Sequence, residues 1–243
     1  MLRRSPHPVR LLAAFAVSLG MLIAPASAFE QPESATGFAP KPFVTAKRQM
    51  VVAAHPLAAE AGLAMLRKGG SAVDAGIAVQ MVLNVVEPQS SGIGGGAFIL
   101  YWHQSNKALT SIDGRETAPA TATPELFLDP QGKPVPRAEV KASGRAVGVP
   151  GVIAALAQAH AAHGRLPWAE LFAPAIAIAR DGFAVPPRLG SQLAELGPRS
   201  FSPEAQALFF DKADRPWPTG YKLRNPALAD TLEMIARDGA DRF

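Results

Sequence analysis

The sequence predicts a mixed α+β fold, and three observations support this class. The segment 71–86 is apolar almost all round, which is typical of a helix buried between layers. The apolar run 97–102 and the segment 108–113 flank a short polar turn, which predicts a hairpin of two strands. Most of the chain after residue 150 is rich in alanine and leucine and is punctuated by glycine and proline, which predicts further helices.

The elements follow in order along the chain. Residues 29–45 are expected to form an extended leader, and the short apolar run 50–54 predicts a buried strand. Residues 57–68 have helical spacing, and two glycines at 69 and 70 supply the stop. Ser71 then offers an N-cap with Asp74 three residues later, in the pattern of a capping box that begins the apolar helix.

The second half of the chain is expected to be mainly helical after a turn-rich stretch at 114–150. Two alanine-rich segments, 151–163 and 168–180, are each ended by a glycine. A last helix begins after the cap Asn225 and runs to Arg237.

Composition and charge exclude several classes of protein. The chain has 243 residues, of which 48% are apolar and none is cysteine, so disulfides and thiolate chemistry are excluded. The net charge is +4, but residues 1–28 hold three arginines and no acid. The remaining 215 residues carry 21 basic and 20 acidic side chains, so no nucleic-acid partner is expected.

Residues 1–28 have the pattern of a secretory signal sequence. Three arginines precede the apolar run 11–23, and the small residues Ala26-Ser27-Ala28 follow, so cleavage is expected before Phe29. A membrane anchor is the alternative, but the run is shorter than the roughly 20 apolar residues that span a bilayer. We therefore expect a mature chain without a membrane span, in the periplasm or secreted.

The glycine run 92–96 matches the letters of a dinucleotide-binding fingerprint. That fingerprint requires a strand first and a helix N-terminus after the glycines, whereas here a helix comes first and a strand follows. The glycines therefore mark either a structural bend or a site where backbone approaches a ligand.

The histidines give little indication of a metal site. His160 and His163 are three residues apart on one predicted helix, but no third ligand lies nearby in the sequence, so an exposed helix end is favoured. His55 and His103 have no obvious serine or carboxylate partner. We expect no metal and no cofactor.

The cluster Asp113-Gly114-Arg115-Glu116 ends the second predicted strand. The guanidinium of Arg115 presents a rigid fork of donors that suits a carboxylate. An ordinary surface ion pair is the alternative, and the residues alone favour it.

Several motifs together resemble gamma-glutamyltransferases, also called gamma-glutamyltranspeptidases or glutathione hydrolases. The resemblance implies an N-terminal nucleophile hydrolase fold, a four-layer αββα sandwich that is present here only in part. The motifs that carry it are Met50-Val51-Val52-Ala53-Ala54-His55-Pro56-Leu57-Ala58, Leu66 to Ala75, Glu87-Pro88, Ser91 to Phe98, Asp113 to Pro119, Gly148 to Gly151, Ala179 to Phe183 and Asn225 to Leu232.

The resemblance also implies the chemistry. Such a precursor cuts itself into a large and a small subunit, and the new N-terminal threonine attacks the gamma-glutamyl amide, with its own α-amine as base. The acyl-enzyme then passes the glutamyl group to water or to an amino-acid or peptide acceptor. Glutathione and other gamma-glutamyl compounds are the implied donors.

Carried over by position, Arg115 holds the α-carboxylate of the glutamyl group, and the glycine run is structural support beside the site. The Thr-Thr-His junction of the family does not occur in this sequence, and Thr117, Thr121 and Thr123 lie in a different motif. Residues 46–243 therefore resemble part of a large subunit, with no catalytic residue among them. Two alternatives remain open: a non-catalytic periplasmic protein that binds gamma-glutamyl compounds, and an acylase of related fold.

Overall fold

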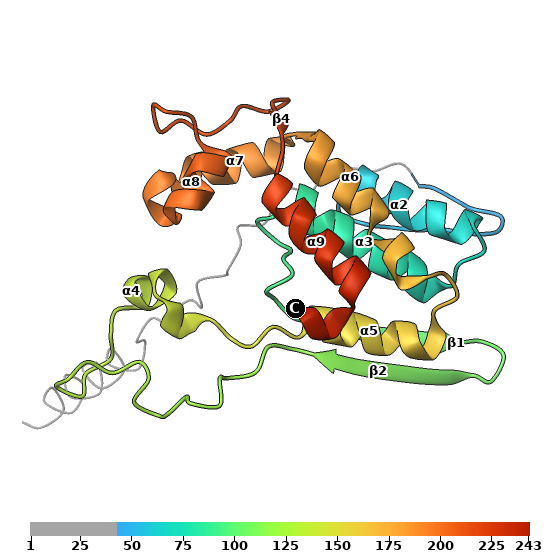
Figure 1. Ribbon diagram of the computed structural model, residues 1–243, viewed down its shortest axis with the longest axis horizontal. Coiled ribbons are helices and arrows are strands. Elements are labelled where there is room, and N and C mark those ends of the chain that lie inside the picture. Colours follow the sequence, from blue (N-terminus) through green and yellow to red (C-terminus); the bar gives the residue numbers. More distant parts are fainter. Residues whose placement is uncertain (1–42) are drawn as a thin grey trace, which may run out of the picture. The chain divides into compact units, whose positions relative to one another are not determined.

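Helix α3 (Ala72–Val86) lies at the centre of the helices in the computed structural model, which describes residues 43–243 (Figure 1). At residues 138, 141 and 142 only the backbone is described. The predicted signal sequence at 1–28 lies outside the described residues, as does the predicted leader except for residues 43–45. The described residues form one unit.

Helix α2 (Pro56–Arg67) packs against α3. The approach is close at Gly62, where a Cβ atom would lie 2.7 Å from Val79 Cγ2. The predicted capping box of α3 is confirmed, because the Ser71 hydroxyl accepts from the Asp74 amide and the Asp74 carboxylate accepts from the Ser71 amide. The turn between the two helices uses Gly69 at φ +91°, as the sequence predicted.

Strands β1 (Ala97–His103) and β2 (Ala108–Gly114) form the predicted antiparallel hairpin, in a register that pairs Ala97 with Gly114. One face of the hairpin packs on α5 (Val152–His163), as Figure 1 shows, and buries Ile112. The opposite face carries large apolar side chains that remain 53–72% exposed: Phe98, Leu100, Trp102 and Leu109.

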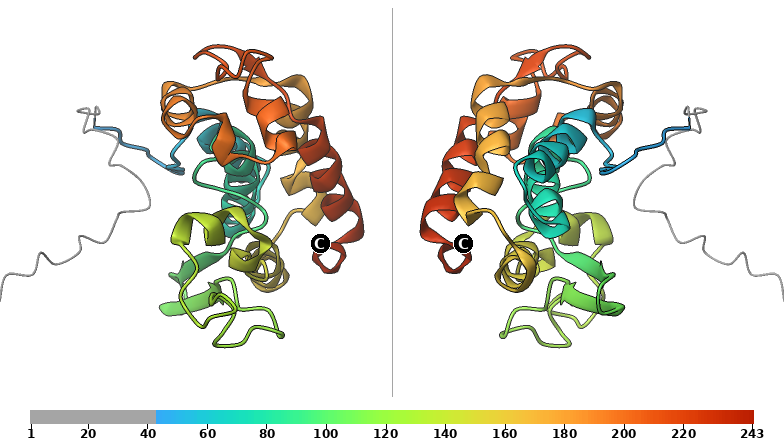
Figure 2. Two further views of the ribbon diagram at one scale, coloured as in Figure 1. Left: turned by 90° about the vertical axis from the view of Figure 1, so that its left-hand side faces the viewer. Right: turned by 90° about the vertical axis from the view of Figure 1, so that its right-hand side faces the viewer.

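The remaining regular elements are helices and one small sheet. Helices α6 (Ala173–Asp181) and α9 (Pro226–Asp238) pack on each other, and α6 packs on α3, so α3 lies between α2 and this pair (Figure 2). The remaining bounds are α4 (Arg137–Ala142), η1 (Gly144–Ala146), η2 (Trp168–Leu171), β3 (Phe183–Ala184), α7 (Pro187–Leu196), η3 (Pro198–Ser200), α8 (Pro203–Phe209), β4 (Lys222–Leu223) and η4 (Ala240–Arg242), with β3 and β4 antiparallel.

Two predicted elements differ from the structure. Residues 50–54 do not form a buried strand: Val52 is 84% exposed, and no strand among the described residues pairs with this segment. Apolar composition alone cannot supply a pairing partner. The predicted helix 168–180 is split into η2 and α6, because Pro174 lacks the amide that would continue the helix from the preceding turn.

Candidate functional site

Three segments far apart in the sequence meet at the end of the hairpin: 92–96, 113–117 and 148–151. The Gly95 carbonyl accepts from the amides of Gly151 and Val152, each at 3.1 Å. Thr117 and Val149 exchange two backbone hydrogen bonds, at 3.4 and 2.9 Å. The segment between α3 and β1 and the segment after β2 are thereby tied to the start of α5.

Glycine is required where these backbones touch. A Cβ atom at Gly96 would lie 2.6 Å from the Gly114 carbonyl oxygen, and one at Gly151 would lie 2.4 Å from the same atom. Because real Cβ atoms do not approach so closely, side chains at these positions would push the segments apart. The geometry thus gives part of the glycine motif a structural role, and α3 before it and β1 after it are in the wrong order for a dinucleotide fold.

A polar cavity of about 440 Å³ opens beside this crossing. Its lining includes the carboxylate of Glu116, one of whose oxygens, Oε2, is buried and accepts no hydrogen bond among the described residues. The Glu116 Oε2 atom lies 3.4 Å from Arg115 Nε. The other lining residues are Gln80, Pro88, Ser90, Ser91, Gly92, Gly94, Gly95 and Gly96.

Arg115 is the first residue after β2. Its backbone amide donates to Asp113 Oδ1 at 2.9 Å, which fixes the direction in which the chain leaves the strand. The side chain is 71% exposed, and Glu116 is its ion-pair partner within the described part of the chain. A guanidinium with one neighbour and open solvent around it can still bind a carboxylate through its remaining donors. The role of Arg115 in binding substrate stays a prediction.

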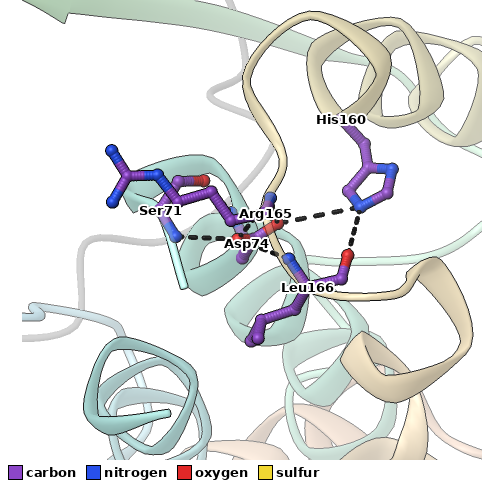
Figure 3. Close-up of polar contacts among 5 residues, drawn as sticks. All are labelled: Ser71, Asp74, His160, Arg165 and Leu166. Atoms are coloured by element: carbon purple, nitrogen blue, oxygen red, sulfur yellow. Dashed lines mark hydrogen bonds and ion pairs between the residues drawn. The ribbon is translucent and has the colours of Figure 1, made fainter. Parts of the chain in front are cut away.

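A second polar cluster is centred on Asp74, in the first turn of α3 (Figure 3). Its buried carboxylate accepts from three backbone amides: Ser71 at 2.7 Å, Arg165 at 3.0 Å and Leu166 at 3.3 Å. The ring of His160 lies 3.7 Å from the same carboxylate, and its Nε2 is 2.8 Å from the Leu166 carbonyl oxygen. The cluster fastens the loop after α5 to the start of α3.

This cluster corrects the expectation that the two helix histidines mark an exposed helix end. The His160 side chain is only 21% exposed, and the His163 ring stacks on Tyr101 with ring centres 4.2 Å apart. Sequence spacing could not show that the carboxylate of Asp74, 86 positions earlier in the chain, would face His160. Over residues 43–243, no group of three or more histidine or acidic side chains could hold a metal ion.

His55 and Glu87 are two further polar residues whose roles sequence reasoning missed. His55 Nδ1 accepts from the Leu57 amide and so caps α2, while Glu87 ends α3 and is buried. Burial lowers the pKa of His55 below its ordinary value of 6.5, against an opposing attraction from Glu87. Glu87 accepts from Gln89 at 2.6 Å and from Arg188 at 3.2 Å. A histidine directly before the proline that begins a helix was the sequence signal that could have predicted this cap.

Between residues 43 and 243, no helix is both long and apolar enough to cross a membrane.

Solved structures of similar proteins define the fold class. The gamma-glutamyltranspeptidase of Helicobacter pylori superposes with a TM-score of 0.76 at 34% sequence identity, over 82% of this chain and 56% of that one. The α+β class is therefore confirmed, and the chain carries part of the N-terminal nucleophile hydrolase fold.

The sequence profile of the gamma-glutamyltranspeptidase family matches residues 58–243, so the chain belongs to that family. It is 40% identical to the glutathione hydrolase proenzyme of Bacillus subtilis strain 168, over 81% of this chain and 33% of that protein. The corresponding protein of Escherichia coli strain K12 is 36% identical, over 98% of this chain and 41% of that protein. The chain thus spans a third to two fifths of the length of these curated relatives.

Proposed function

We propose that the full-length protein containing this chain is a gamma-glutamyltransferase that also acts as a glutathione hydrolase. The match to the family over residues 58–243 carries the proposal, together with the placement of Arg115 at the crossing of the three segments. The substrates are gamma-glutamyl compounds such as glutathione, and the acceptors are water, amino acids or peptides.

Arg115 binds the α-carboxylate of the glutamyl group in this proposal. The nucleophile is a threonine in the region that this chain does not include, since the sequence has no Thr-Thr-His junction. Its hydroxyl oxygen forms an ester with the γ-carbonyl carbon, the amide C–N bond breaks, and the amine leaves with the proton taken up by the threonine α-amine. Water or an acceptor amine then cleaves the ester.

The name proenzyme, which the curated relatives carry, supports self-cleavage into a large and a small subunit. The basic, apolar and small-residue order of residues 1–28 supports export to the periplasm or medium, with cleavage before Phe29. N-terminal sequencing of exported protein tests this point, and a retained Met1 would contradict it.

The activity is tested by comparing the full-length protein with residues 29–243 on a gamma-glutamyl anilide. The full-length protein should release the aniline and cleave itself, while residues 29–243 should do neither, because no acyl-enzyme forms without the threonine. Turnover by residues 29–243 above a heat-killed control contradicts the assignment of the nucleophile. Binding of glutathione without turnover by the full-length protein supports a non-catalytic binding protein instead.

Arg115 is tested by two substitutions in the full-length protein. Arg115 is open to solvent in the described chain, and in this proposal the bound glutamyl group covers the charged pair. Losing one partner of a pair buried in this way costs about 2–5 kcal/mol, so Arg115→Ala should lower kcat/KM by roughly 30-fold to several thousand-fold. Arg115→Lys keeps the charge but loses the fork, so it should weaken substrate capture without blocking self-cleavage.

An analogue with its α-carboxylate amidated is the control for Arg115. The loss should be much smaller with this analogue than with the ordinary donor. Equal losses for both donors would make Arg115 a residue of a structural ion pair.

A further inference from the structure

A second cavity, of about 360 Å³, lies on the surface between α8 and β4, apart from the crossing of the three segments. Its lining combines two aromatic rings, Trp217 and Tyr221, with two basic side chains, Lys222 and Arg224. The other lining residues are Ala207, Leu208 and Leu223. None of these residues lines the cavity beside Glu116. It is independent of the proposed function.

The two cations share one side of β4. Leu223 is buried against the core, whereas Lys222, in β4, and Arg224, the first residue after β4, are exposed. Both side chains pass Gly182, since a Cβ atom there would lie 2.8 Å from Arg224 Cγ and 3.0 Å from Lys222 Cγ. Arg224 Nε donates to the Asp181 carbonyl oxygen at 3.1 Å, which orients the guanidinium and leaves its terminal nitrogens for another partner. Within residues 43–243, neither cation has a carboxylate at ion-pair distance, so their charges are not already matched.

The aromatic wall is held rigidly. Trp217 Nε1 donates to the Leu208 carbonyl oxygen at 2.9 Å, and the Trp217 and Tyr221 rings stack with centres 4.1 Å apart and an interplanar angle of 5°. The Tyr221 carbonyl oxygen accepts from the Val185 amide at 2.9 Å, which ties the aromatic loop to the segment after β3. A surface of this kind loses little conformational freedom when a ligand binds.

We propose that Trp217, Tyr221, Lys222 and Arg224 form a binding site for a carboxylate that is joined to an aromatic or apolar group. The guanidinium fork and the ammonium group hold the carboxylate, and the flat body of the ligand lies against the aromatic pair. A free aromatic acid and the C-terminal residue of a peptide share this chemistry.

The test measures binding of N-acetyl-L-phenylalanine to the full-length protein by calorimetry or ligand-observed NMR, with N-acetyl-L-phenylalanine amide as the uncharged match. We expect saturable binding of the acid and at least about tenfold weaker binding of the amide, because only the acid satisfies the two cations. Equal binding of the two probes, or binding of neither, would overturn the proposal. A peptide ending in phenylalanine that binds more tightly than the free acid would support a peptide C-terminus as the ligand.

Substitutions locate the binding. Arg224→Gln and Lys222→Gln should each weaken binding of the acid by about tenfold, whereas Arg199→Gln, which removes an exposed cation outside the cavity, should leave binding unchanged. Lys222 makes no side-chain hydrogen bond among the described residues, so Lys222→Gln remains informative if loss of the Asp181 contact harms the fold of Arg224→Gln.

A variant at the proposed glutamyl site distinguishes the two sites. Arg115→Ala should bind the acid like the wild type, and weaker binding by Arg115→Ala would instead place the ligand in the proposed glutamyl site. Because the readout is binding, it can fail while the gamma-glutamyl activity stands, and the reverse also holds.

Discussion

Helix α3 and the hairpin β1–β2 bury their apolar side chains to very different extents. On α3, Met81, Val82 and Val86 have no exposed surface, because α2, α5 and α6 surround the helix. On the hairpin, α5 covers one face, and the four large side chains of the other face stay more than half exposed. A two-stranded sheet is marginally stable on its own, so the helices supply most of the packing of this chain, while one face of the hairpin presents an apolar surface of the kind that packs against another part of a protein.

Asp74 should give the largest difference between the two regions. Asp74→Ala leaves the backbone amides of Ser71, Arg165 and Leu166 without their buried acceptor and should lower the free energy of unfolding by about 3–5 kcal/mol. Asp129→Ala is the control, because Asp129 likewise accepts from backbone amides, two where Asp74 has three, but lies in the turn-rich segment after the hairpin. We expect about 1 kcal/mol there. Urea unfolding of the full-length protein measures both, and equal losses would contradict the special position of Asp74.

The second-largest difference in stability between α3 and the hairpin is expected when an apolar side chain is truncated. Met81→Ala opens a cavity in the closed core and should cost about 2–5 kcal/mol. Leu100→Ala should change stability by less than about 0.5 kcal/mol in this chain, because the side chain is already mostly in water. The two variants are compared by their urea midpoints in residues 29–243. A large loss for Leu100→Ala would show that its face is covered in solution.

The smallest expected effect concerns the pH dependence contributed by His55. Its pKa is lowered in the fold, so below about pH 6.5 the unfolded chain takes up a proton that the folded chain does not, and stability falls as the pH falls through that value. His55→Asn keeps a good N-cap but removes the titration, so unfolding should depend less on pH between about 7.5 and 5. His103→Asn in the hairpin is the control. A slope as steep as that of the wild type in His55→Asn would contradict the assignment.

Local sequence patterns predicted most helices and the hairpin, and the features that they failed to predict depend on contacts between segments distant in the sequence. Spacing and caps located α2, α3, the hairpin, α5 and α9, because each has its own start and stop signals. The segment 50–54 shows the limit: it is half-buried but unpaired within the described residues, since a strand requires a partner strand that its own sequence does not specify. The site follows the same rule: the position of Arg115 after a strand was predictable, but the meeting of Asp74 with Arg165 and the burial of Glu87 depend on how the helices pack.

The pairing of Thr117 with Val149 has a consequence for how the chain can vary. Together with the contact between Gly114 and Gly151, it closes the segment 118–148 at its base, so the ends of this segment are fixed whatever its interior does. The entropy of closing a loop grows only slowly with its length, by about 0.6 kcal/mol for each doubling. Insertions and deletions within 118–148 are therefore thermodynamically cheap, and homologous chains can differ widely in length there while α5 and the hairpin keep their places.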